Sequence, residues 1–137
     1  MSYPGIGVML KALFGAKQID SILQKHIGKT ISKAELFNDS LRLTFEDGAR
    51  ISIYDDGQSC CEHRYMVIDD DLSQFTGAKL LGVEVRDAPN IEDGYGEHEV
   101  QFLEVQTSLG VISAANHNEH NGYYGGFWLQ VAELPGP

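Results

Sequence analysis

The stretch that decides the fold is LRLTFEDGARISIYD, residues 41–55. In its first half, polar residues alternate with three apolar ones, Leu41, Leu43 and Phe45. This period of two is typical of a strand that buries one face. The Asp-Gly pair at 47–48 is a strong signal for a tight turn, and RISIYD continues the alternation after it. The stretch therefore predicts two antiparallel strands joined by a hairpin.

Strand patterns continue on both sides of this hairpin. ISKAELF (31–37) and the turn NDS precede it, so residues 31–55 are predicted to form a three-stranded meander. Downstream, LLGVEVRDA (80–88) and FWLQVAEL (127–134) are predicted strands. Residues 100–116 are predicted to form a further hairpin that turns at Ser108-Leu109-Gly110.

Helices and loops complete the prediction. Residues 6–24 have helical spacing in part, and DDDLSQFTG (69–77) suits a short helix with an aspartate N-cap and a glycine stop. The polar stretches 56–65, 89–99 and 117–126 are predicted loops. We expect an α+β fold: a mainly antiparallel β-sheet of six or seven strands, with an N-terminal helical segment and a short mid-chain helix.

The length of 137 residues fits a single domain, with an N-terminal helical extension (1–27) and a sheet-rich core (28–134). The apolar segment Ile6–Phe14 has little polar cover for a surface helix, and a sheet of this size leaves exposed edges. We therefore expect burial against a second copy of the chain, in a homodimer or a larger assembly.

Location is predicted from what the sequence lacks. No apolar run approaches the ~18 residues of a membrane span, and the first residues lack the features of a signal peptide. The adjacent Cys60 and Cys61 are poorly placed to pair with each other, because the ring would be strained. We expect a cytoplasmic protein without a membrane partner, with both thiols reduced and at least one of them buried.

The net charge of −10 is unevenly distributed. Residues 1–36 contain five lysines against Asp20 and Glu35, a sum of +3, so the remaining residues sum to −13. Binding to long nucleic acid is not expected, since it depends on neutralising many phosphates. A small anionic ligand needs only a few local donors and is compatible with this charge.

The stretch HNEHNGYYGGF, residues 117–127, is the most unusual part of the chain. As a loop between two strands it offers amide, imidazole, backbone N–H and aromatic groups, which suit a ligand pocket. The alternative is a turn only, because Asn-Gly is itself a strong hairpin signal. The candidate ligand-binding residues here are Asn116, His117, Asn118, His120, Asn121, Gly122, Tyr123 and Tyr124.

A metal site or a catalytic site is a second possibility. Ligand and nucleophile types are present at Cys60, Cys61, His63, His98, His117 and His120. Their spacing matches no zinc knuckle, no signature surrounds the cysteines, and there is no Gly-x-Ser-x-Gly or P-loop motif. We therefore expect no metal, no cofactor and no catalytic residue. A Cys/His-centred metal or hydrolytic protein, and a protein of structural or assembly role, stay as alternatives.

Several motifs together resemble a family of small phage-encoded proteins. They are the Gly-Lys-x-Ile start, the Asp-Gly hairpin, the Cys-Cys-Glu block, a Leu-x-x-Phe-x-Gly segment and the Asn-Gly-Tyr-Tyr turn, which span about residues 28–131. The family is the first type of Thoeris anti-defence protein, which binds cyclic ADP-ribose isomers made by bacterial TIR enzymes without cleaving them. Some members also capture cyclic oligonucleotides of the CBASS pathway.

The resemblance implies a non-enzymatic sponge for a cyclic nucleotide immune signal, acting as an assembly in the cytoplasm of an infected bacterium. One departure is that VISAANHNEH, residues 111–120, contains no arginine where the family carries one. The His-Asn-Glu-His insert is a substitute set of donors. Arg64 and Arg86 are the predicted guanidinium partners for phosphate, because Arg42 and Arg50 lie on strand faces that read as solvent surface.

Overall fold

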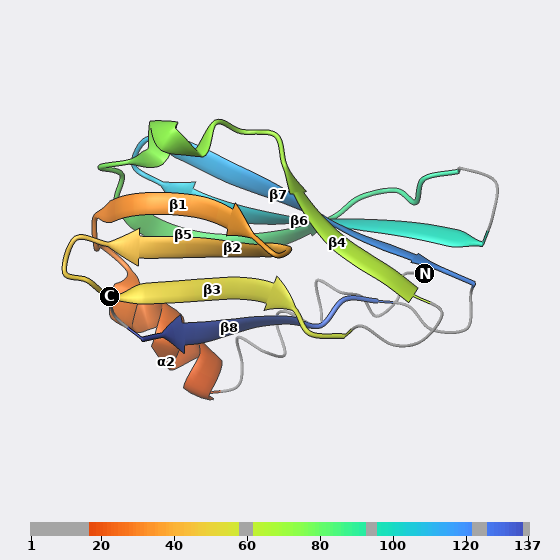
Figure 1. The fold of residues 1–137 in the computed structure, drawn as a ribbon, viewed down its shortest axis with the longest axis horizontal. Helices are drawn as coiled ribbons and strands as arrows, with labels where there is room; N and C mark the ends of the chain where they lie inside the picture. The colour runs from red at the N-terminus through yellow and green to blue at the C-terminus, as the bar shows by residue number, and fades with distance from the viewer. Residues whose placement is uncertain (1–16, 58–61, 93–95, 122–125, 136–137) are drawn as a thin grey trace.

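The computed structural model describes residues 17–57, 62–92, 96–121 and 126–135 (Figure 1). These residues form eight antiparallel strands in two four-stranded sheets. In order across the first sheet, the strands are β1 (Ile31–Phe37), β2 (Ser40–Phe45), β3 (Arg50–Asp55) and β8 (Leu129–Leu134). In order across the second, they are β4 (Glu62–Ile68), β7 (Gly110–His120), β6 (Glu97–Thr107) and β5 (Leu80–Asp87).

The predicted meander is confirmed as β1-β2-β3. The turn after β1 is made by Asn38 and Asp39, with φ of +48° and +59°, a conformation that asparagine and aspartate tolerate better than most residues. The second turn falls at the predicted Asp47-Gly48, where Gly48 has φ of +89°. The hairpin of β6 and β7 also turns where predicted, between Thr107 and Gly110.

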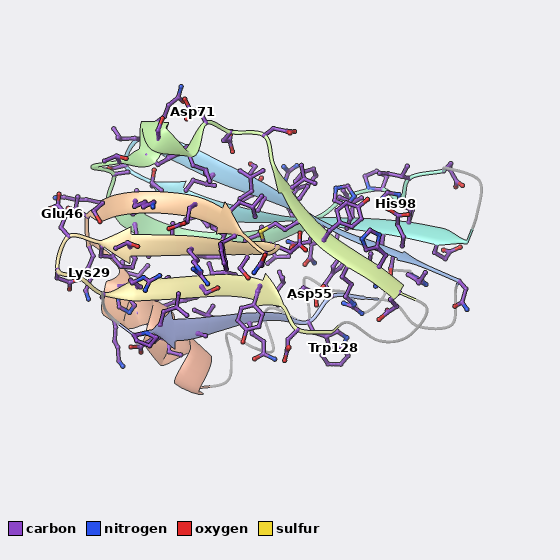
Figure 2. The ribbon with its side chains drawn as sticks, in the orientation of Figure 1. Lys29, Glu46, Asp55, Asp71, His98 and Trp128 are labelled. Atoms are coloured by element: carbon purple, nitrogen blue, oxygen red, sulfur yellow. The ribbon has the colours of Figure 1, made fainter. Side chains whose placement is uncertain are left out.

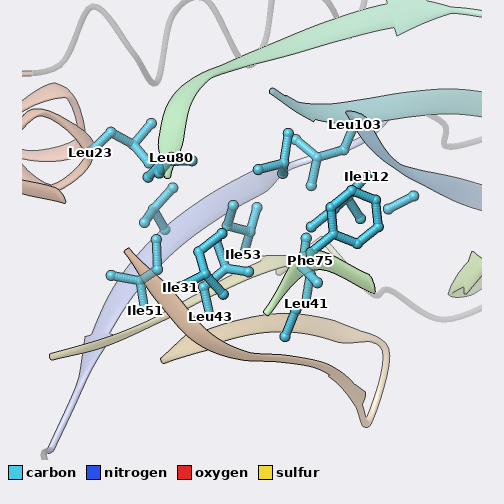
Figure 3. Close-up of a cluster of buried hydrophobic side chains, with 14 of the residues drawn as sticks. Leu23, Ile31, Leu41, Leu43, Ile51, Ile53, Phe75, Leu80, Leu103 and Ile112 are labelled. Carbon is cyan, nitrogen blue, oxygen red and sulfur yellow. The ribbon is translucent and has the colours of Figure 1, made fainter. Parts of the chain in front are cut away.

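One hydrophobic core lies between the two sheets (Figure 3). Alternate residues of β2 and β3 meet alternate residues of β6 and β7, so the period-two pattern of the sequence becomes one buried face on each sheet. The side chains that are fully buried include Leu41, Leu43, Ile51, Ile53, Leu103 and Ile112. The first sheet is the shorter one, and β6 and β7 extend well beyond it (Figure 1).

Two helical elements cover parts of this core. The helix α2 (Lys17–His26) confirms part of the predicted segment 6–24 and runs two residues past it, while residues 6–16 lie outside the described part. A 3₁₀ helix, η1 (Leu72–Phe75), confirms the predicted short helix with Asp71 as its N-cap, and Gly77 beyond it has φ of +91°. No helix among the described residues is long and apolar enough to span a membrane.

Three predicted loops are wrong in part. β4 occupies residues 62–65 of the first, β6 begins at Glu97 within the second, and β7 runs on to His120 within the third. The strand count of six or seven is also too low, and the strands form two packed sheets. The missed strand ends carry few apolar residues, so their alternation is invisible in a hydrophobic pattern.

Candidate functional site

Three strands of the second sheet change from apolar to polar at the same level. The register places four successive rows on the core-facing side, which are Ile68–Ala114–Leu103, Met66–Asn116–Gln101, Arg64–Asn118–Glu99 and Glu62–His120–Glu97. The first rows face the first sheet, whereas the last rows lie toward the ends of β6 and β7 that extend beyond it (Figure 1). We call the last two rows, with Asp55, Asn116, Gln101 and Gly126, the polar end.

The Arg64 guanidinium is held between two carboxylates at the polar end. Its Nη1 lies 2.8 Å from Oδ2 of Asp55, and its Nη2 lies 2.8 Å from Oε2 of Glu62. The side chains of Arg64 and Glu62 are 4% and 0% exposed. Ion pairs so thoroughly withdrawn from water persist only with good geometry and further hydrogen bonds, which Arg64 also provides.

Those further bonds fix the backbone of Gly126. Nη1 of Arg64 and Nδ2 of Asn118 donate to its carbonyl oxygen at 2.9 and 3.0 Å, and its N–H donates to Oε1 of Glu99 at 2.9 Å. Gly126 has φ of +79°, which favours glycine. Nε2 of His120 lies 2.8 Å from the same Glu99 oxygen. Side chains from β4, β6 and β7 thus bind Gly126, and Glu99 of β6 also binds His120 at the end of β7.

Two buried amide oxygens at the polar end accept no hydrogen bond from the residues that the structure describes. Oδ1 of Asn118 and Oε1 of Gln101 are buried without a partner among the described residues. The Nδ2 of Asn118 already donates to Glu62 and Gly126, so exchanging its oxygen and nitrogen would not satisfy it. Buried acceptors of this kind are rare and mark a place where a donor is needed from the rest of the chain, from water or from a ligand.

The opposite face of the same strands carries an aromatic and imidazole cluster, which we call the outer cluster. It consists of His63, Tyr65, His98, His117 and Glu119. The rings of Tyr65 and His117 are parallel with centroids 4.6 Å apart, and the hydroxyl of Tyr65 donates to Glu119 at 2.6 Å. Figure 2 places His98 on this extended part of the second sheet.

Two imidazoles of the outer cluster share a hydrogen bond. Nε2 of His98 and Nδ1 of His117 are 2.8 Å apart, so one of them is the donor and the other the acceptor. Burial lowers the pKa of His117, His98 beside it lowers that pKa further, and the Glu119 carboxylate opposes both effects. His117 is therefore disposed to be neutral, as a hydrogen-bonding and stacking group.

Strand alternation separates the predicted site residues. Asn116, Asn118 and His120 face the polar end together with Arg64, whereas His117 lies on the opposite face. The residues that were predicted to line one pocket therefore project from opposite faces of β7. Asn121 is exposed directly after β7, and Gly122, Tyr123, Tyr124, Cys60 and Cys61 lie outside the described residues.

The two predicted arginines lie apart. Arg86 is on the edge strand β5, where it pairs with Glu104 at 2.7 Å, and β6 separates it from β7. Arg64 is beside the predicted loop, but two carboxylates already bind it, and its role toward phosphate stays a prediction. Glu62, Tyr65, Glu99 and Glu119 were not predicted from the sequence, because only strand pairing reveals that they are neighbours of the predicted residues.

The described residues contain no group of three or more His, Cys, Asp or Glu side chains that could hold a metal ion. The fold and the site therefore define a two-sheet antiparallel β-protein with a buried polar network at one end. The chain belongs to the family described as Domain of unknown function (DUF7448), whose model matches residues 24–129. No curated protein and no solved structure matches it.

Proposed function

We propose that this protein sequesters a small cyclic nucleotide without cleaving it. The observation that carries the proposal is the anchoring of the Asn-Gly-Tyr-Tyr segment. On its far side, Gly126 is bound by Arg64, Asn118 and Glu99, and on its near side His120 is bound by Glu99. A buried polar network is costly to maintain, and here it fixes the ends of a chemically rich segment.

The remaining features agree with binding rather than turnover. The sequence motifs resemble those of cyclic ADP-ribose sponges, and an acidic protein can bind one small anion while rejecting polymeric nucleic acid. Imidazole and amide groups of the segment, with its aromatic rings, supply hydrogen bonds and stacking for a nucleotide. A protein that acts in this way as an assembly in an infected bacterium would deprive a defence effector of its activating signal.

The test is titration calorimetry with cyclic ADP-ribose isomers and cyclic oligonucleotides. We expect the wild type to bind at least one of them. His117→Ala, Asn121→Ala and Tyr124→Ala should each weaken binding by about tenfold, the scale of one stacking contact or one well-placed hydrogen bond. Asn90→Ala, at an exposed position next to β5, is the matched control and should bind like the wild type.

The fate of the ligand separates a sponge from an enzyme. The complex is denatured and the released nucleotide is analysed by mass spectrometry. Intact ligand supports sequestration, whereas a cleaved product identifies an enzyme. Binding of none of the panel by the folded protein overturns the proposal.

A further inference from the structure

A second surface lies on the outward face of the first sheet, where β3 ends at Asp55 and β8 begins at Leu129. Asp55 pairs with Leu129 in the register, and the next residues outward, Asp56 and Trp128, are joined by a backbone hydrogen bond of 3.0 Å. Residues directly opposite each other on paired strands project from the same face, with Cβ atoms about 5 Å apart. Figure 2 labels Trp128 close to Asp55.

Trp128 is 47% exposed although both of its backbone polar groups are hydrogen-bonded. Its N–H donates to Oδ1 of Asp55 at 3.1 Å, its carbonyl oxygen accepts from Asp56, and Phe127 before it is buried. Gly57 packs so closely that a Cβ atom there would collide with both the Trp128 ring and the Arg64 guanidinium. An indole fixed in this way loses little conformational entropy when a planar group stacks on its open face.

The polar groups beside the indole are the Asp56 carboxylate and the Gln130 amide. Tyr54 and Gln130 form the next register pair on this face, and Nε2 of Gln130 donates to Oδ2 of Asp56 at 3.2 Å. This bond orients the exposed Asp56 carboxylate and leaves Oδ1 without a partner among the described residues. A ring with an amino group can donate to Oδ1 while it stacks on Trp128. A uracil ring has no exocyclic amino group, and its single N3–H donor lies between two carbonyl oxygens that the carboxylate repels.

We propose that Trp128 and Asp56 form the base subsite of the protein, with Trp128 as the stacking platform and Asp56 as the acceptor for an exocyclic amino group. The inference names the base recognised by the proposed nucleotide-binding function and rests on that function for its biological ligand. Trp128 follows the anchored Gly126 by two residues, so this surface and the predicted pocket lie at the same end of the molecule.

The chain contains one tryptophan, which makes Trp128 its own reporter. Adenosine 5′-monophosphate is titrated against the wild type while the tryptophan fluorescence is followed, and uridine 5′-monophosphate is the matched probe. We expect adenosine monophosphate to quench the emission and to bind roughly tenfold more tightly than uridine monophosphate, the scale of one hydrogen bond to a charged group.

Variants are compared by calorimetry, because they remove the reporter. Trp128→Ala should weaken adenosine monophosphate binding about tenfold, whereas Trp128→Phe should retain most of it. Asp56→Asn should remove the preference over uridine monophosphate, since an amide can both donate and accept. Leu109→Ala, at an exposed apolar position in the β6–β7 turn, is the control for surface truncation and should have no effect.

The outcomes separate this inference from the proposed function. If cyclic nucleotides bind the wild type and Trp128→Ala equally, sequestration stands and the subsite is overturned. If adenosine monophosphate binds through Trp128 but no cyclic nucleotide binds, the subsite stands and the proposed function fails. If no nucleotide binds the folded wild type, both are wrong.

Discussion

The two ends of β7 bury different kinds of side chain on the same face. At one end Ile112 and Ala114 face the first sheet and are fully buried among apolar side chains. At the other end Asn116 and Asn118 occupy the same face of the same strand, equally buried, among amides and charged groups. Neighbouring strands change with it, so the difference belongs to the sheet and not to one residue.

The change from apolar to polar side chains along β7 follows from what each end of the strand contacts. Apolar residues pack where the other sheet supplies an apolar face, and packing of this kind has no preferred direction. Beyond the first sheet, β4, β6 and β7 contact connecting backbone, whose N–H and C=O groups must be hydrogen-bonded. Glu99, Arg64 and Asn118 provide those bonds at Gly126. The apolar rows between the two sheets, which we call the apolar end, specify the fold, and the polar end holds the backbone of Gly126.

Arg64→Ala tests the polar end with the largest expected effect. It leaves Glu62 and Asp55 buried without their counter-charge, and breaking a buried pair in this way costs about 3–5 kcal/mol of unfolding free energy. Urea unfolding followed by circular dichroism measures it. Arg86→Ala is the matched control at an exposed pair and should cost less than about 1 kcal/mol. Equal effects of the two would show that the buried pairs contribute no more than the exposed pair.

Leu43→Ala tests the apolar end. Leu43 is fully buried between the sheets, so its truncation leaves a cavity and should lower the unfolding free energy by about 3 kcal/mol. Leu43 lies between the two sheets and not at the polar end. The affinity of the folded variant for a nucleotide should therefore equal that of the wild type. The comparison of the two ends would break if Leu43→Ala weakened ligand binding as strongly as it weakened folding.

Asn118→Leu carries the apolar character of β7 one row further into the polar end. The change removes the bonds to Glu62 and to the Gly126 carbonyl, but it also removes the buried oxygen that has no donor among the described residues. We expect a net loss of about 1–2 kcal/mol, below that of Leu43→Ala. The segment after β7 should become more protease-sensitive, which limited proteolysis measures. Unchanged cleavage would mean that Gly126 is held without Asn118.

The same difference explains how far the sequence could predict the structure. The meander and the β6–β7 hairpin were predictable, because Asp47-Gly48 and the apolar alternation are local signals. The polar ends of β4 and β7 were not, since AANHNEH alternates between two sets of polar residues and resembles a loop. Their partners come from distant parts of the chain, so the network of Arg64, Asn118 and Glu99 follows only from the register.

The smallest expected effect concerns a polar group placed in the apolar end. His26, the last residue of α2, is 3% exposed and stacks on Phe45 with ring centroids 5.1 Å apart. Neither ring nitrogen has a partner among the described residues. Burial lowers the pKa of His26, and the nearby Lys29 lowers it further, as Lys25 does; Glu133 and Asp47 oppose this. The folded protein therefore binds a proton here less readily than the unfolded chain.

The sign of the pH dependence follows from that direction. The contribution of His26 to stability is fully present above the unfolded pKa of about 6.5 and is lost as the pH falls through it toward the folded pKa. His117, whose pKa is also lowered, acts in the same direction. Carboxylates with lowered pKa, such as Asp47 and Glu133, lose their contribution only below about pH 4.5, so the two windows can be separated.

His26→Phe should therefore flatten the rise of unfolding free energy between about pH 5.5 and 8, while keeping a ring against Phe45. His26→Gln is the matched control, since it is polar but does not titrate in this range, and it should flatten the profile to the same extent at a lower absolute stability. Part of the pH dependence of the unfolding free energy should remain in both variants because the pKa of His117 is also lowered. This remaining slope should fall again when His117→Gln is added. A profile as steep as that of the wild type in both His26 variants would show that the buried imidazole at the apolar end does not control the pH dependence.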